Sequence, residues 1–213
     1  MLAIQYALDG AKAFGFELTG DLASRLLEEY RTDDRELETE AIASALLKAG
    51  LVHEASRRLL KPEDGSYYEP QYHFHVLISS TKAALDGLAL WLNLRRNLGL
   101  DGPACDFTKK RYRQALSIHF PSEVRGLIEH WLDQIRWYSI WQEHRGTMPI
   151  LRLVDAVTGE HRTFEVLVDR ANSDSQRLLE ERLDTEDIGT LATYWPRRLA
   201  DFVLAFTRYG LDT

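Results

Sequence analysis

The fold is decided by residues 74–92, FHVLISSTKAALDGLALWL, the most strongly periodic stretch of the chain. Its large apolar residues recur at intervals of three and four, which is the spacing of one face of an α-helix. They are Phe74, Leu77, Ile78, Leu85, Leu88 and Leu92, with Thr81 among them. A second set occupies the other side of the same helix: Val76, Ala83, Gly87, Leu90 and Leu94. A helix that is apolar on most of its circumference is buried between several neighbours. We therefore expect a central helix over residues 72–95.

A second long helix is predicted over residues 122–145, antiparallel to the first and packed beside it. Ser122 is a suitable N-cap, and Gly146 stops the pattern. The residues predicted to face the core are Val124, Leu127, Ile128, Trp131, Ile135, Tyr138 and Gln142. A last helix is predicted from about residue 194 to residue 209, with Leu199, Phe202, Val203 and Phe206 facing inward.

Between these helices the apolar pattern changes to the period of two that β-strands show. Short β-branched runs lie on both sides of Thr158-Gly159, which is a turn signal. We therefore predict a β-hairpin over about residues 149–168.

Residues 1–60 also carry helical periodicity. One apolar stripe, formed by Ala41, Ile42, Ala45, Leu46 and Ala49, ends at Gly50, which is a plausible C-cap. A short helix over about 53–60 is expected to follow. Two short helices within 39–60 could form a helix-turn-helix, but Glu36, Glu38 and Glu40 oppose contact with DNA. We interpret the segment as a structural helical hairpin and expect no specific DNA binding.

The clearest break in the chain is the stretch KPEDGSYYEP, residues 61–70, in which two prolines and a glycine interrupt any helix. It suggests an N-terminal helical segment over 1–60, a linker or turn over 61–71, and a bundle over 72–213. The predicted fold is mainly α, an up-and-down helical bundle with two long central helices and one inserted β-hairpin.

Composition excludes several classes of protein. The chain has 213 residues, of which 45% are hydrophobic, and a net charge of −7, so the molecule as a whole does not attract phosphate backbones. The single cysteine, Cys105, can form no disulfide within the chain. No secretion signal and no membrane-spanning stretch is recognisable. We expect a cytoplasmic protein that has no membrane association.

No motif for a cofactor, a metal or an activated nucleophile stands out. Phosphate-binding loops and the serine-hydrolase elbow are absent. His73 and His75 are two residues apart, which on a helix directs them away from each other. We interpret both as capping or solvent-facing residues, and we expect neither a metal nor a cofactor.

Three tryptophans, Trp131, Trp137 and Trp141, allow two interpretations. They could form a platform on which bases stack, or they could pack in the core, which is more usual for aromatic residues at helical spacing. The neighbouring Arg136, His144 and Arg145 make this the most interesting surface of the chain.

The stretch WYSIWQEHRG, residues 137–146, resembles the end of a long helix in the HEPN superfamily (higher eukaryotes and prokaryotes nucleotide-binding), and residues 72–93 resemble its partner helix. The resemblance covers about residues 68–209. It implies a four-helix bundle that forms a homodimer. In active members, a dimer brings together an arginine and a histidine that are separated by four to six residues in the chain, and these residues cleave RNA without a metal. Here the resemblance makes His144 the candidate general acid/base, with Arg136 or Arg145 holding phosphate.

The position five before His144 is Ser139, and Arg136 stands eight residues before it, outside the spacing of the motif. Two hypotheses follow. The first is a non-catalytic HEPN-like interaction protein, in a prokaryotic defence or toxin–antitoxin setting, which forms a homodimer or binds a protein partner. The second is a metal-independent HEPN-type RNase or RNA-binding protein that uses His144 with Arg136 or Arg145. The net charge and Ser139 favour the first.

Overall fold

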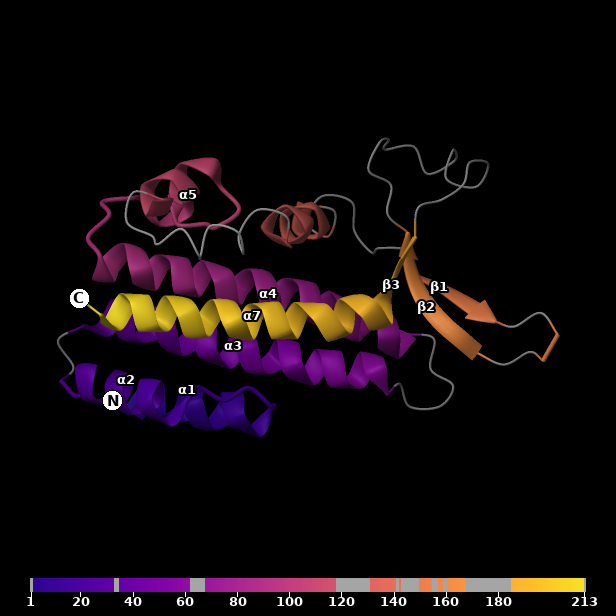
Figure 1. Cartoon of the computed structure of the whole chain (residues 1–213), viewed down its shortest axis with the longest axis horizontal. Coiled ribbons are helices and arrows are strands. Elements are labelled where there is room, and N and C mark those ends of the chain that lie inside the picture. The colour runs from indigo at the N-terminus through magenta and orange to yellow at the C-terminus, as the bar shows by residue number, and fades with distance from the viewer. Residues whose placement is uncertain are drawn as a thin grey trace.

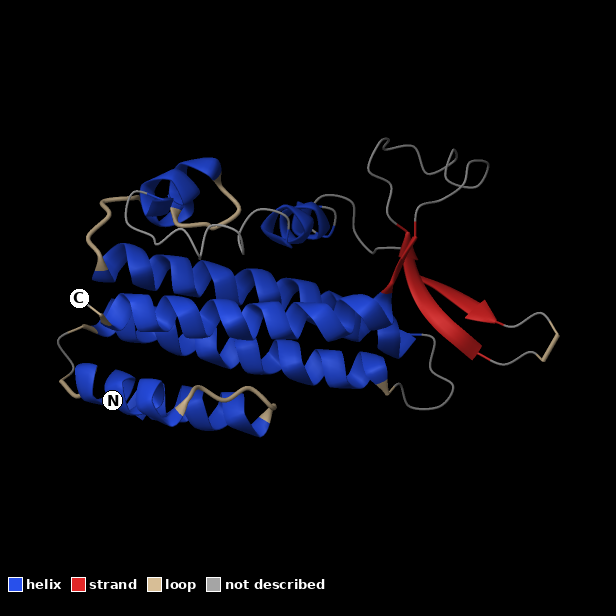
Figure 2. Cartoon of the chain, in the orientation of Figure 1, coloured by secondary structure: helices blue, strands red, loops and turns tan. Residues whose placement is uncertain are grey.

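The computed structural model describes residues 2–32, 35–61, 68–117, 131–140, 142, 150–154, 157–158, 161–167 and 185–212. The fold is mainly helical, as predicted, with one small sheet (Figures 1 and 2). The helices are α1 (Leu2–Ala13), α2 (Gly20–Glu29), α3 (Glu36–Leu60), α4 (Tyr68–Arg95), α5 (Lys110–Ser117) and α7 (Ile188–Leu211), with the 3₁₀ turn η1 (Gly102–Ala104). Residues 131–140 are also helical. The strands are β1 (Ile150–Val154), β2 (His161–Leu167) and β3 (Thr185–Asp187).

Three long helices, α3, α4 and α7, form the middle of the molecule (Figure 1). The shorter helices α1 and α2 lie on one side of them, α5 and helix 131–140 lie on the other, and the sheet stands at one end. One hydrophobic core runs through these layers and contains residues from both sides of the predicted linker, including Leu46 of α3 and Leu85 of α4.

Among the helices whose contacts are fully described, α4 packs most extensively against α3. The predicted partner of α4, the helix over 122–145, also contacts it, because the ring of Tyr138 stands 5.7 Å from the ring of Phe74. Within the predicted helix 122–145, residues 131–140 and 142 are helical, and the remainder lies outside the described residues. α4 also begins at Tyr68, so its first turn occupies the end of the predicted linker.

α3 is one continuous helix of 25 residues, so the predicted C-cap at Gly50 and the predicted helical hairpin over 39–60 are wrong. Gly50 lies inside α3 at the point where α1 packs closely against it. A Cβ atom at Gly50 would stand 2.8 Å from the Cα atom of Ala11. The glycine therefore permits a close helix crossing, although it costs about 0.5–1 kcal/mol of helix stability relative to alanine.

α7 begins at Ile188, six residues before the predicted start, and contains Pro196 in its interior. A proline inside a helix has no N–H with which to reach the carbonyl four residues earlier. That carbonyl belongs to Ala192, and it accepts a hydrogen bond from the hydroxyl of Ser56 on α3. Ser56 is 7% exposed and supplies the donor that Pro196 lacks.

The predicted β-hairpin is confirmed. β1 pairs with β2 in antiparallel fashion, with Ile150 opposite Val166, and Thr158 lies in the turn. The other predicted turn residue, Gly159, lies outside the described residues. A third strand, which the sequence pattern did not indicate, extends the sheet because β3 pairs antiparallel with β2. Asp187 ends β3 and caps α7 by accepting from the N–H groups of Gly189 and Thr190.

At the opposite end of the bundle, an ion-pair network joins α2 to α4. The carboxylate of Glu29 lies 2.6 Å from Arg95 and 2.6 Å from Arg35. Burial alone would raise the pKa of Glu29, but the hydrogen bonds from Arg95 and Arg35 outweigh it and lower that pKa. Nearby, the Trp91 indole donates to the Tyr30 hydroxyl over 2.6 Å.

Glu29→Gln is expected to lower the free energy of unfolding at pH 7 by about 1–3 kcal/mol, because Arg95 is left without its charged partner. Folding lowers the pKa of Glu29. Its contribution to the free energy of unfolding is therefore fully present above its pKa in the unfolded chain, and it is lost as the pH falls through its pKa in the folded protein. The difference between wild type and variant, measured by urea unfolding, should therefore shrink from pH 7 to pH 3. The control is Glu28→Gln, which changes an exposed neighbour. An equal loss of stability in Glu28→Gln would contradict the stabilising role assigned to the ion pairs of Glu29.

Candidate functional site

Of the three predicted site residues, only Arg136 lies within the described residues, where it is exposed on helix 131–140. His144 and Arg145 lie outside them. Ser139, five residues before His144, is 5% exposed. This position faces the interior, so an arginine side chain there would displace core contacts before it reached a substrate.

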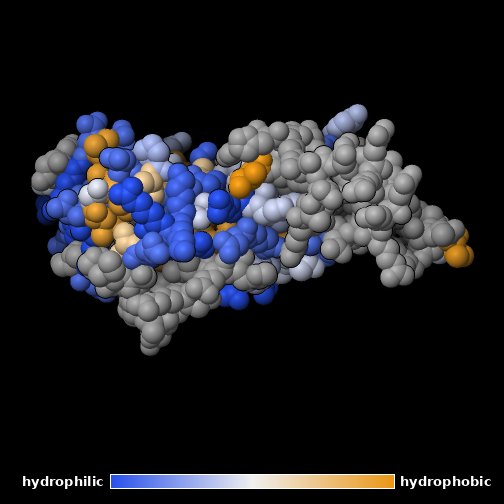
Figure 3. Space-filling model, turned by 90° about the horizontal axis from the view of Figure 1, so that it is seen from above, coloured by the Kyte–Doolittle hydropathy of each residue, from blue (hydrophilic) through white to orange (hydrophobic). Residues whose placement is uncertain are grey.

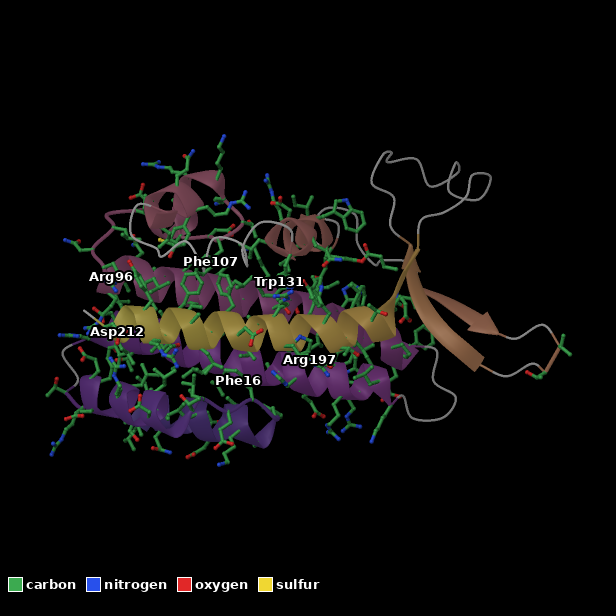
Figure 4. All side chains as sticks on the ribbon, viewed as in Figure 1. Phe16, Arg96, Phe107, Trp131, Arg197 and Asp212 are labelled. Carbon is green, nitrogen blue, oxygen red and sulfur yellow. The ribbon has the colours of Figure 1, made fainter. Side chains whose placement is uncertain are left out.

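The aromatic residues of this helix mostly fill the core. Trp131 is 2% exposed and packs 5.8 Å from the ring of Phe202 on α7. Figure 4 shows Trp131 and Phe107 in the layer between the long helices and the helices above them. Trp137 is half-buried and stands edge-on to Tyr138 at 5.0 Å, while Trp141 lies outside the described residues. The interpretation of Trp131 as a core residue is confirmed.

A polar junction, defined by Gln134, Tyr138, Glu186 and Trp195, joins helix 131–140 to β3 and α7. The Glu186 carboxylate accepts from the Gln134 amide at 2.9 Å and from the Tyr138 hydroxyl at 2.8 Å. The Gln134 carbonyl in turn accepts from the Trp195 indole at 3.2 Å. These polar groups bind one another, which fixes helix 131–140 against the sheet end of the bundle.

A second contact fixes the end of the same helix to α4. The Gln142 amide donates to Nδ1 of His75 over 2.8 Å, so the ring proton of the neutral imidazole is on Nε2. Burial lowers the pKa of His75, which favours this neutral form. His75 is thus half-buried and partnered by a side chain from a distant segment, which corrects the prediction of a capping or solvent-facing residue. Its neighbour His73 lies 3.6 Å from the Glu69 carboxylate.

Sequence reasoning missed Gln134, Glu186 and His75 as members of this region. Tyr138 and Gln142 were placed on the core-facing stripe of their helix. Gln134, Glu186 and His75 carry no local sequence signal for these contacts. Glu186 lies 52 residues from Gln134 in the chain, and His75 lies 67 residues from Gln142. Only the tertiary fold brings them together.

A basic edge is formed at the start of α5 by Lys109, Lys110, Arg111 and Arg113. The first three are exposed, and Arg113 forms a 3.1 Å ion pair with Asp133 of helix 131–140. No acidic residue stands in the first turn of α5, where the helix dipole would favour one. Figure 3 views this side of the molecule and shows a mainly hydrophilic surface over the part that the structure describes.

The outer stripe of α4 is its least covered apolar face. It runs through Tyr68, Tyr72, Val76, Ser79, Ala83, Leu90 and Leu94, which are spaced by three or four residues except between Ala83 and Leu90, where Asp86 and Gly87 occupy the intervening turn. Tyr68 is 78% exposed and Tyr72 is 65% exposed, and Ser79 is exposed as well. Val76, Ala83, Leu90 and Leu94 are half-buried, and Val76 and Leu90 pack against the hydrophobic core.

The remaining candidates show no reactive arrangement. Cys105 is buried, and burial raises the pKa of its thiol. Within the described ranges, no group of three or more His, Cys, Asp or Glu side chains is placed to hold a metal ion. None of the helices described here combines the length and the apolar content needed to cross a bilayer.

In comparisons with known proteins, the chain matches no family model, no curated protein and no solved structure. The polar junction, the basic edge of α5 and the outer stripe of α4 are therefore the features on which a function can be argued.

Proposed function

We propose that this chain is a HEPN-like helical interaction protein, which acts by binding another protein chain in a prokaryotic defence or toxin–antitoxin setting. The observation that carries the proposal is the outer stripe of α4. Soluble helices normally turn such a stripe toward a neighbour, because burial of apolar surface is favourable by about 25 cal/mol per Å². Here large side chains such as Tyr72 remain 65% exposed along it.

The surroundings of Arg136 support the same proposal. The family's arginine position holds Ser139, which faces the core. The nearby polar groups Gln134, Tyr138 and Glu186 bind one another and hold the helix in place. This arrangement supports a structural role for the polar junction.

A second candidate function is metal-independent cleavage or binding of RNA, and the basic edge of α5 favours it. Lys110 and Arg111 are exposed and could attract a phosphate backbone. Because the RNA 2′-hydroxyl is an internal nucleophile, an imidazole that moves its proton and a guanidinium that holds the phosphate suffice. His144 would be the general acid/base, and Arg136 or Arg145 would bind the phosphate.

One experiment separates the two functions. Wild type and His144→Ala are incubated with single-stranded RNA in EDTA, and folding is verified by circular dichroism. The interaction function predicts that the two proteins are equally inert. Cleavage by wild type that His144→Ala abolishes would overturn this proposal in favour of the RNase. If His144→Ala cleaves RNA only when magnesium replaces the EDTA, a contaminating nuclease or a different site is responsible, and the assay is then repeated with repurified protein.

A further inference from the structure

We infer that a pocket at the sheet end of the bundle binds a small organic carboxylate, a ligand in which one carboxylate group is attached to an apolar body. The pocket lies between the end of α3 and the first turns of α7, and its volume of about 490 Å³ is in the range of small-molecule sites. Figure 4 shows Arg197 on the half of α7 nearer the sheet. The inference is independent of the proposed function, because no lining residue belongs to α4. The lining residues include Leu60, Asp187, Thr190, Thr193, Tyr194 and Arg197.

The charged groups of the pocket favour an anionic ligand. The Asp187 carboxylate is already used within the chain, because it accepts from the N–H groups of Gly189 and Thr190 at 3.2 and 2.9 Å and from the Thr190 hydroxyl at 2.8 Å. Arg197, by contrast, is exposed and forms no ion pair with any residue that the structure describes. Its guanidinium can therefore hold the carboxylate of a ligand through two parallel hydrogen bonds.

The same contacts favour a carboxylate over a phosphate. Phosphate groups commonly bind to the free N–H groups at the start of a helix. At the start of α7, the N–H groups of Gly189 and Thr190 are taken by Asp187. The negative charge of Asp187 on the pocket wall would also repel a dianion more strongly than a monoanion. A ligand with a single negative charge, directed at Arg197, fits this arrangement.

The rest of the pocket suits an apolar body that carries a hydrogen-bond donor. Leu60 and Tyr194 leave apolar surface at the pocket, since they are 49% and 38% exposed. The Arg198 guanidinium stands 5.0 Å from the centroid of the Tyr194 ring and restrains that ring through a cation–π contact. The Thr193 hydroxyl donates to the Gly189 carbonyl at 2.8 Å, so its remaining capacity is that of an acceptor. An aromatic acid that carries a hydroxyl group meets these conditions.

The test is a calorimetric titration of the full chain with para-hydroxyphenylacetate, and with the uncharged amide of this acid as the matched ligand. The acid should bind at least about tenfold more tightly than the amide, because only the acid can pair with Arg197. Arg197→Gln should weaken binding of the acid by about the same factor and leave binding of the amide unchanged. The matched control is Arg208→Gln, which removes another exposed arginine from the far end of α7 and should bind the acid as wild type does.

A second variant fills the pocket. Thr193→Phe places a large side chain at an exposed position of the pocket wall, and circular dichroism verifies that the variant is folded. It should abolish binding of both the acid and the amide, and unchanged binding in this variant would overturn the assignment of the site. The inference would also be overturned if wild type bound neither ligand at about 10 mM, or bound the two equally well. Equal affinity of Arg197→Gln and Arg208→Gln for the acid would overturn it as well.

Discussion

Leu85→Asp is expected to unfold the protein. Leu85 is fully buried on α4, in the core that α4 shares with α3 and α7. A carboxylate at this position would have no partner in an apolar environment, which costs several kcal/mol, and the lost apolar contacts add to the cost. The total is comparable to the whole stability of an ordinary domain, about 5–15 kcal/mol. Far-UV circular dichroism at 25 °C should show the loss of most helical signal.

Leu37→Asp is the matched control for this variant. Leu37 lies in the first turn of α3 and is 65% exposed, so the same change removes little buried surface. An acidic residue near a helix N-terminus is also favourable. The melting temperature of Leu37→Asp should stay within a few degrees of wild type. If Leu85→Asp unfolded cooperatively at a melting temperature close to that of Leu37→Asp, this result would show that the periodic face of α4 is not the core.

The elements that could be predicted from the sequence are those whose signal is local. The helix around Leu85 was found because its core face repeats over several turns, and the structure buries that face. The hairpin was found because the apolar period changes on both sides of Thr158, and β1 and β2 pair around it. In both cases the pattern within one segment determines its secondary structure.

The elements that were missed depend on contacts between distant segments. Gly50 gives the same local signal whether it ends a helix or lets another helix cross, and only the position of Ala11 decides between them. The short strand β3 has three residues and forms because β2 offers it an edge. A pattern within one segment cannot contain this information.

The candidate site could be predicted only in part for the same reason. Arg136 and Ser139 were identified by their distance from His144, but the sequence could not show that Ser139 faces inward while Arg136 is exposed. The contacts of Glu186 with Gln134 and Tyr138 join segments that are far apart in the chain. The spacing of residues within a helix therefore identified the region, whereas the tertiary fold determined which side chains meet there.

α7 begins at Ile188 and continues through Pro196, and this leads to a second prediction with a large effect. Ser56→Ala should lower the free energy of unfolding by about 1–3 kcal/mol, because the Ala192 carbonyl is left buried without a donor. The change removes a single hydroxyl oxygen, so the lost packing is small. Urea unfolding gives the difference directly.

The cost of Ser56→Ala should disappear when the proline is removed. Pro196→Ala restores a backbone N–H group at residue 196, which can donate to the Ala192 carbonyl in place of the serine hydroxyl. In the Pro196→Ala background, Ser56→Ala should therefore cost little. The double-mutant cycle is expected to give a coupling free energy of about 1 kcal/mol or more between two residues on different helices. Equal costs of Ser56→Ala in both backgrounds would show that the hydroxyl of Ser56 does not stabilise α7 through this carbonyl. A coupling of the expected size would explain how α7 continues through Pro196, and why a serine is buried on α3 at that point.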